Sequence, residues 1–336
     1  MEMPASFCSR LNLSMDPQTD RCWKMTDSNS QVPWSDEQWD RVKRAIQEEA
    51  NRARVAATFL PLFGPLPASA DFVRREEIII DNRITIADTD TIKLPTLQVK
   101  VHLRGAQMAD PELASALALF RRAANLLARL EDALIFNGQP GESQVPPGGP
   151  PNIWEIRGGQ QSKGLLATAA TLAGANPPPS VPAAPDGEKL VVAVSDAIGI
   201  LESNGHFGPF AVALGQRLFL AAQTPNRGSL VLPQDRIIPF LGGGPLVRST
   251  TLPDDKGVVV ALGGAPVELV IATDVSLNFL QVAPDPMFVF RVYEKMALRI
   301  KESDAIVALL PPPPAAGAGA GPVDPTAAGR GRHKSA

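Results

Sequence analysis

The residue types that most often carry catalysis or bind metals are few and scattered in this chain of 336 residues. The three histidines are His102, His206 and His333, and no H-x-x-x-H or H-E-x-x-H spacing would place two of them on one helix face. Glu131 and Asp132 are adjacent, so on a helix they would project roughly 100° apart and could not share a proton as a pair. We interpret them as a capped, solvated or interfacial helix end, and we expect no metal site in the chain.

Other catalytic signatures are also missing from the sequence. Cys8 and Cys22 lie in a polar N-terminal stretch without CxxC spacing, which is typical of reduced cysteines in a cytoplasmic protein. The glycine run 242–244 lacks the preceding strand and following helix of a phosphate-binding loop. There is no G-x-S-x-G elbow, and Tyr293 is the one tyrosine. The residues argue against an enzyme: we expect no catalytic residue and no cofactor held by this chain.

Composition and charge narrow the class of partner. The 32 lysines and arginines are balanced by 35 acidic residues, for a formal net charge of -3, so no basic field would attract nucleic acid. The sequence shows neither a secretory leader nor an apolar run of about 20 residues that could span a membrane. We expect a soluble cytoplasmic protein with no nucleic-acid or membrane partner.

The elements that would have to position a site begin after a polar N-terminal arm. Ser35 followed by Gln38 forms a capping box that predicts a helix start. From there, Trp39, Val42 and Ile46 begin a narrow apolar stripe, which continues through alanines toward a helix end before residue 61. Such a stripe must dock on another surface.

A hairpin, a strand and a long helix are predicted next. Two isoleucine-rich runs, 77–80 and 84–86, flank a polar turn and predict an extended hairpin. Alternation from Leu97 to Leu103 predicts a half-exposed strand with His102 on its polar side. Asp110 is expected to cap a spine helix of about 26 residues that ends at Asn137-Gly138.

The remainder reads as a second lobe followed by closing strands. Residues 190–194 fit either a strand or the opening of a helix that runs to Ser203, whereas Phe210 to Leu214 fit a buried strand. Strands are also expected at 267–272, 288–294 and 296–301.

Several of these segments resemble the encapsulins, the bacterial nanocompartment shell proteins. Residues 130–138, LEDALIFNG, resemble the family's E-D-x-x-I-F-x-G signature, and Gly164-Leu165-Leu166 resembles the G-L-L that follows it. The stretch 205–214, GHFGPFAVAL, and the closing segments 290–294 and 298–306 also resemble family motifs. The similarity spans roughly residues 34 to 310 in the family's order.

The resemblance implies an α+β fold of the tailed-phage major capsid (Hong Kong 97) type. The parts expected on that basis, in chain order, are a disordered arm (1–33), the N-terminal helix and start of the peripheral domain (34–63), an extended loop (64–97), the peripheral domain with the spine helix (98–139), an axial domain (140–264), closing strands of the peripheral domain (265–310) and a disordered Pro/Gly/Ala-rich tail (311–336).

The resemblance also implies a function: a homo-oligomeric icosahedral shell of about 60 or more copies that encloses a cargo enzyme. The cargo would be a ferritin-like iron-oxidising protein or a dye-decolourising-type peroxidase, so iron or haem would belong to the cargo and not to the shell. A short C-terminal cargo peptide would dock near the N-terminal helix, which makes Trp39, Val42 and Ile46 the docking candidates; packing on the shell's own core is the alternative for this stripe. Asn226 and Arg227 correspond to the family's five-fold pore loop. Asp88 stands near the place where some shells carry a flavin-stacking tryptophan, so no flavin is expected.

Two alternative functions have less support from the sequence than the shell function. A bacteriocin-like or proteolytic protein would need a nucleophile with a base, which the sequence does not show. A phage major capsid protein would share the fold and would be favoured by an interior basic arm, but the N-terminal arm is of mixed charge.

Overall fold

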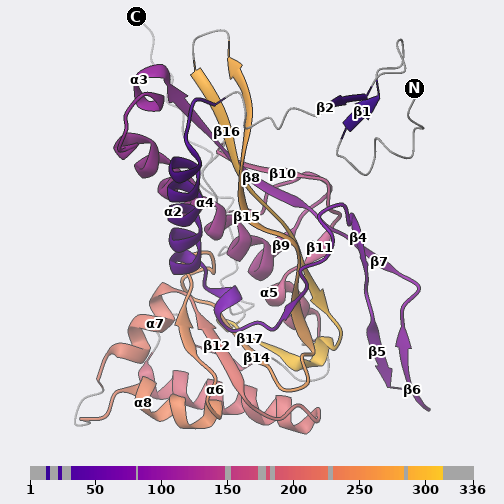
Figure 1. The fold of residues 1–336 in the computed structure, drawn as a ribbon. Coiled ribbons are helices and arrows are strands. Elements are labelled where there is room, and N and C mark those ends of the chain that lie inside the picture. Colours follow the sequence, from indigo (N-terminus) through magenta and orange to yellow (C-terminus); the bar gives the residue numbers. More distant parts are fainter. Residues whose placement is uncertain are drawn as a thin grey trace, which may run out of the picture.

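The computed structural model describes residues 13–15, 22–24, 32–80, 82–147, 153–172, 179–181, 186–225, 230–283 and 287–312, and it consists of two lobes with a projecting hairpin (Figure 1). Each lobe is built on its own sheet: five strands in the order β10-β8-β16-β15-β3 in one, and four in the order β13-β12-β14-β17 in the other. Each sheet is covered by helices, so the α+β class is confirmed.

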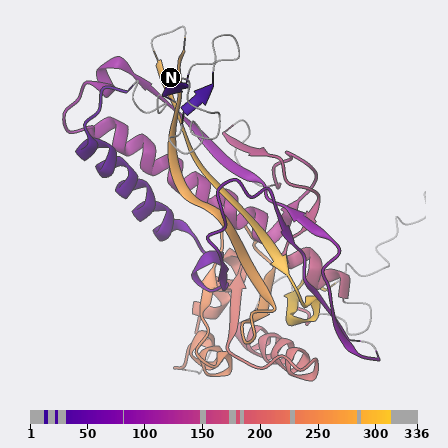
Figure 2. The same ribbon diagram turned by 45° about the vertical axis from the view of Figure 1, so that its right-hand side comes forward.

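The five-stranded sheet is organised by one long antiparallel pair. This pair runs diagonally across the molecule in Figure 2, and β8 pairs with the distal half of β16, from Met287 to Lys295. The strands predicted at 288–294 and 296–301 form one continuous strand, β16, because its backbone ladder with β15 continues through both segments. The strands of this sheet are β3 (Leu62–Phe63), β8 (Thr96–Arg104), β10 (Trp154–Arg157), β15 (Val267–Ala283) and β16 (Met287–Ile300).

Two helices cover one face of this sheet and lie side by side in both ribbon views (Figures 1 and 2): α2 (Asp36–Ala53) and the spine helix α4 (Ala114–Asn137). The spine helix begins four residues later than Asp110, its expected cap. The Asp110 carboxylate accepts hydrogen bonds from the backbone N–H groups of Glu112 and Ala114, and Leu113 has a left-handed φ of 53°. Residues 110–113 therefore form a turn that precedes the helix.

In the second lobe, α6 (Gly187–Ser203) and α7 (Gln216–Gln223) pack on the four-stranded sheet, and α8 (Pro233–Ile237) packs against both helices. Residues 190–194 belong to a helix, because the Asp186 side chain accepts the N–H of Glu188 and starts the helix before them. The strand predicted at Phe210–Leu214 is confirmed as β12 and is buried along its whole length. The elements of this lobe are α6 (Gly187–Ser203), β12, α7 (Gln216–Gln223), α8 (Pro233–Ile237), η4 (Ile238–Leu241), β13 (Leu246–Arg248), β14 (Gly257–Ala261) and β17 (Ile306–Leu309).

The two lobes exchange strands along the chain. β17 comes from the range expected to close the peripheral domain, yet it pairs with β14 of the second sheet. Conversely, β10 comes from the range expected to form the axial domain and pairs with β8 of the first sheet. All four residues of β17 are buried, so this strand is apolar on both faces and fits a sheet that is covered on both of its faces.

The predicted extended hairpin is confirmed and projects from the side of the molecule (Figure 1). Its base pairs β4 (Phe72–Arg74) with β7 (Thr91–Lys93), and its distal part pairs β5 (Glu77–Ile80) with β6 (Ile84–Ala87). Ile80 is 70% exposed and its strand partner Ile84 is 76% exposed. A two-stranded ribbon with exposed isoleucines buries little surface within its own subunit.

Short elements complete the described chain. Within the segment expected to be a disordered arm, β1 (Leu13–Met15) and β2 (Cys22–Lys24) form an antiparallel pair, and Val32 is buried. The remaining elements are η3 (Ala56–Thr58), α3 (Gly105–Met108), β9 (Gly138–Gln139), β11 (Ser162–Lys163), α5 (Leu165–Leu172) and η5 (Ser303–Ala305). Among the described helices, none combines the length and hydropathy that crossing a lipid bilayer would require.

Candidate functional site

The helix that carries the predicted docking residues, α2, is fixed at its N-terminal end by a cluster of aromatic rings. Trp34 stacks on Phe290 of β16 with ring centroids 5.2 Å apart and an angle of 11° between the planes, and it meets Trp39 and Phe120 edge to face. The Trp34 indole N–H donates to the carbonyl of Met108 over 3.2 Å. The capping box is present as predicted, since Ser35 and Gln38 exchange side-chain-to-backbone hydrogen bonds. The start of α2 is therefore tied to both α4 and the sheet.

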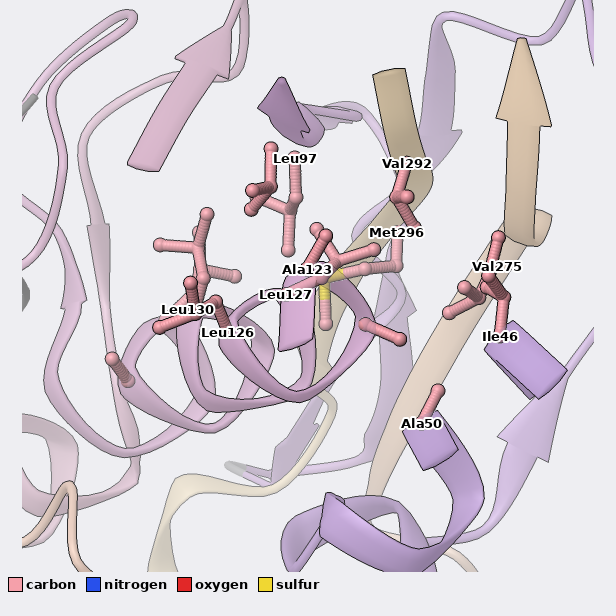
Figure 3. Packing of buried hydrophobic residues seen from close by; sticks show 14 of the residues in the cluster. Ile46, Ala50, Leu97, Ala123, Leu126, Leu127, Leu130, Val275, Val292 and Met296 are labelled. Atoms are coloured by element: carbon pink, nitrogen blue, oxygen red, sulfur yellow. The ribbon is translucent and has the colours of Figure 1, made fainter. Parts of the chain in front are cut away.

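The apolar stripe of α2 faces the chain's own core. Trp39, Val42 and Ile46 are 7%, 0% and 1% exposed and belong to the main hydrophobic cluster. Figure 3 shows Ile46 beside Val275 of β15. The structure thus shows core packing for this stripe, while its part in docking a cargo peptide stays a prediction.

The outward face of α2 is charged and polar. Its exposed side chains include Asp40, Lys43, Arg44, Glu48 and Arg52. Arg41 is ion-paired with Glu112 of the turn before α4 at 3.0 Å, and across the seam with α4 the Asn125 side chain donates to Glu49 over 3.3 Å. A hollow next to Ala45 lies in this seam, and it is lined by Ala45, Glu48, Glu49, Arg52 and Arg121.

The C-terminal end of α2 is fixed by a buried charge cluster centred on Arg54. The guanidinium lies 2.8 Å from Glu131 of α4, 2.9 Å from Glu294 of β16 and 2.8 Å from Asp274 of β15. The side chains of Glu131 and Glu294 are completely buried, whereas Asp274 is 57% exposed. One cation therefore joins α2 to α4 and to both long strands.

Of the alternatives for Glu131 and Asp132, the solvated helix end is wrong, because both side chains lie inside the protein against the segment that ends α2. The two acids make two different contacts. Glu131 binds Arg54, while the Asp132 carboxylate accepts the backbone N–H groups of Val55 and Ala56 over 3.1 and 2.8 Å. Asp132 thereby holds in place the chain segment that follows α2.

Burial has the largest effect on the pKa values of the carboxyl groups in this cluster. It raises the pKa of Glu131 to about 7, although the Arg54 charge opposes the change, and it raises the pKa of Asp132 to about 7 against the two backbone hydrogen bonds. Burial and the neighbouring Glu131 also raise the pKa of Glu294 well above its ordinary value. The cluster holds protons near neutral pH that the same carboxyl groups would release in water.

The pairing of Glu131 with Glu294 around Arg54 could not be recognised from the sequence. The two carboxylates are far apart in the chain, and Arg54 looks like one more basic residue at the end of a charged helix. The one available signal was the position of two adjacent acids within an otherwise apolar helix end, 130–136. Burial of that segment on all sides would have required partners for both acids.

The remaining predicted site residues are placed as follows. Asn226 and Arg227, the pore-loop candidates, lie outside the described residues, as do Cys8, His333 and the tail 313–336. Asp88 is ion-paired with Arg74 in the projecting hairpin. A hollow of about 860 Å³ lies against the base of that hairpin, and its lining contains Gln139, Gln160 and Lys163 but no histidine or cysteine.

Comparison with known proteins decides the family. The chain is 29% identical over 304 residues to the type 1 encapsulin shell protein EncA of Myxococcus xanthus (strain DK1622), covering 84% of this chain and 95% of that protein. The sequence profile of the linocin family, described as an encapsulating protein for peroxidase, matches residues 26–145 and 160–297. The chain belongs to the encapsulin shell-protein family. This confirms the resemblance seen in the sequence motifs and identifies the chain as an encapsulin shell subunit.

Solved structures agree on the fold of this encapsulin. The virus-like particle protein of Pyrococcus furiosus matches with a TM-score of 0.57 at 16% identity, over 81% of this chain and 99% of that chain. A protein of Microbacterium phage Oxtober96 matches with a TM-score of 0.52 at 14% identity, over 77% and 91% of the respective chains. These matches confirm the capsid-type fold, and at these identities the likeness concerns the fold alone.

Two motif glycines of the encapsulin have a physical reason in the structure. Gly138 ends α4 with φ of 81°, and a Cβ there would collide with the backbone of Ser162 and Gly164. A Cβ on Gly164 would in turn collide with the backbone of Phe136 and Gly138. The end of the spine helix and the β9–β11 ladder can approach each other because neither position carries a side chain.

Proposed function

We propose that this encapsulin subunit assembles into a closed, hollow icosahedral particle of about 60 or more copies, located in the cytoplasm, and encloses a cargo enzyme. The observation that carries the proposal is the projecting hairpin, whose exposed isoleucines include Ile80 and Ile84. A ribbon of this kind gains stability when a second copy of the chain covers its apolar side chains. The membership of the chain in a shell-protein family supports the same conclusion.

The cargo is proposed by class. The description of the family as encapsulating a peroxidase supports a dye-decolourising-type peroxidase; a ferritin-like iron-oxidising protein is the other candidate. In either case, iron or haem chemistry would take place in the cargo, and the shell would supply the container and its pores. The near-neutral net charge of -3 supports an interior that does not package nucleic acid.

For docking, we propose that a short C-terminal cargo peptide lies along α2 at its seam with α4. Trp39, Val42 and Ile46 then support the helix from beneath, since they are almost completely buried. The hollow beside Ala45 offers one apolar contact with Glu48, Arg52 and Arg121 around it, which fits a peptide that carries both apolar and charged side chains.

The first experiment is to express the chain alone and examine it by size-exclusion chromatography and negative-stain electron microscopy. Uniform hollow particles would support the proposal, and a monomer or small oligomer would contradict self-assembly. For docking, the double variant Glu48→Lys/Arg121→Glu should form normal particles with less cargo after purification from the native host. The control variant Lys189→Glu, an exposed position on α6, should retain its cargo. Unchanged loading of the double variant would exclude this seam.

A further inference from the structure

The fold brings together three side chains that the sequence keeps far apart: His206, Glu302 and Asp304. Their potential ligand atoms all lie within 4.8 Å of one another. His206 follows α6, and the two acids lie in the connection from β16 to β17, so the group joins segments about 100 residues apart in sequence. Separation along the chain, and not spacing within a motif, is why the histidine looked isolated in the sequence.

The histidine is held in place by its surroundings. The His206 backbone N–H donates to the carbonyl of Leu201 over 2.9 Å, so the loop folds back on the last turn of α6. The imidazole is 10% exposed, and its Nε2 lies 3.1 Å from Asp304 Oδ1. A nearly buried imidazole aimed at a carboxylate has lost most of its rotamer freedom before any ligand arrives.

The acidic side of the cluster is also fixed by the backbone. The Asn204 side-chain amide donates to the carbonyl of Asp304 over 3.1 Å, which ties the two segments together directly. The backbone N–H of Glu302 donates to the carbonyl of Pro266 over 3.2 Å. The three ligand-bearing positions are therefore set by main-chain contacts that do not depend on the charges themselves.

The charge balance favours a cation. Among the described residues, Glu302 has no ion-pair partner and Asp304 is paired with His206 alone. Two carboxylates that share one imidazole leave a region of negative potential, which a divalent ion would neutralise.

The donor set indicates which cation. One imidazole nitrogen with two carboxylate oxygens suits first-row divalent ions such as Zn²⁺, Mn²⁺ and Fe²⁺, whereas Ca²⁺ and Mg²⁺ prefer oxygen ligands alone. Metal–ligand bonds of about 2.1 Å in a tetrahedral site separate the ligand atoms by about 3.4 Å. Rotation of the partly exposed carboxylates closes the remaining gap without moving the buried imidazole.

We propose that His206, Glu302 and Asp304 form a binding site for a first-row divalent cation, with Zn²⁺ as its probe. The ion would connect the end of α6 to the segment that leads into β17, the outer strand of the four-stranded sheet. Its role would be to stabilise the subunit. The proposal does not depend on cargo or on the docking face of α2.

The test uses assembled particles freed of metal with a chelator and titrated with ZnCl₂ by calorimetry. We expect one site per subunit and a melting temperature that rises by about 3 °C or more when Zn²⁺ is present at 100 times its dissociation constant. His206→Gln should weaken binding at least about 10-fold and abolish the rise. His102→Gln, which changes an exposed histidine on β8, should behave like the unmodified chain.

Glu302→Gln is the variant that separates a metal site from a simple ion pair. It leaves the His206–Asp304 contact in place and removes one ligand. A metal site predicts weaker Zn²⁺ binding with an unchanged melting temperature in the chelated state; an ion pair alone predicts no effect of Zn²⁺ on either protein.

Substitution by Co²⁺ gives a direct spectroscopic reading, since visible bands from nitrogen and oxygen ligands differ from the near-ultraviolet charge-transfer band of thiolates. Visible bands that are lost in His206→Gln would support the site. A thiolate band would assign the metal to cysteine and overturn the proposal, as would equal Zn²⁺ binding by His206→Gln and the unmodified chain.

Discussion

Glu131 of the spine helix and Arg54 at the end of α2 form an ion pair, 2.8 Å between Oε2 and Nε, in which the carboxylate side chain has no exposed surface and the guanidinium side chain is 9% exposed. Glu294 approaches the same guanidinium from the sheet. The guanidinium therefore fixes α2, α4 and the sheet at one point, while burial raises the pKa of both carboxyl groups around it. Each member of the cluster depends on the others for its own stability in the interior.

Arg54→Ala is expected to destabilise the subunit strongly. Removing the cation leaves Glu131 and Glu294 buried without a counter-charge, and breaking a buried pair in this way costs about 3–5 kcal/mol. Thermal unfolding of purified particles measures the effect. Arg41→Ala, which breaks the exposed pair with Glu112, should cost less than about 1 kcal/mol. Equal losses of stability in the two variants would show that burial does not make the Arg54 pair contribute more than an exposed pair.

The stability of the subunit should fall as the pH rises from about 5 to 7. The folded state keeps protons on Glu131 and Asp132, each with a pKa of about 7, that the unfolded chain releases near its ordinary values of 4.5 and 3.8. The folded state thus binds more protons than the unfolded state in this pH window. The resulting stabilisation is complete at pH values below the unfolded-state pKa values and is lost as the pH rises through the folded-state pKa values. Glu131→Gln should flatten the slope of melting temperature against pH. An unchanged or steeper slope in Glu131→Gln would contradict the assignment.

Trp34→Ala should loosen the start of α2 at a cost of about 3–5 kcal/mol, because the stacked contact with Phe290 and the edge contact with Phe120 are lost together. Trp34→Phe keeps an aromatic ring and loses the hydrogen bond to Met108, so it should cost about 1 kcal/mol. Chemical unfolding of both variants compares the contribution of the ring contacts with that of the hydrogen bond. The ring contacts would be unimportant if the phenylalanine variant were as unstable as the alanine variant.

The double variant Ile80→Lys/Ile84→Lys should fold and fail to assemble. Both side chains are mostly exposed in the subunit, so lysine costs little there, but it would place charges in an apolar contact between copies. Circular dichroism checks folding and mass photometry checks assembly, with Ile80→Val/Ile84→Val as the control that should still form particles. Normal particles from the lysine variant would exclude the hairpin tip from the subunit contacts.

The sequence predicted best those elements whose pattern is local. The capping box at Ser35, the alternation from Leu97 to Leu103 and the hairpin around the isoleucines depend on neighbours within a few residues. All three are present in the structure, except that Gln98 is buried within the alternation, where it donates to Glu155 of β10. The start of α4 was displaced because the Asp110 side chain caps a turn before the helix, a choice that depends on the left-handed Leu113. Propensity alone does not distinguish the two geometries.

The parts that could not be predicted depend on contacts across long sequence separations. Arg54 and Glu294 meet 240 residues apart, and His206 meets Asp304 98 residues apart. Neither contact leaves a periodic signal in the chain. The destination of β17 was hidden for the same reason, because an apolar strand of four residues fits any covered sheet.

The exchange of strands between the sheets has a consequence for how the subunit is made. β14 stays unpaired along one edge until residues 306–309 have been added, and these follow the whole of the long pair β15–β16 in the chain. The second lobe therefore cannot be completed until the long strands of the first lobe have been synthesised, however early its own helices form. Nascent chains that end before residue 306 would lack a finished second lobe, so recruitment of neighbouring copies should wait until the strands of both lobes have been made.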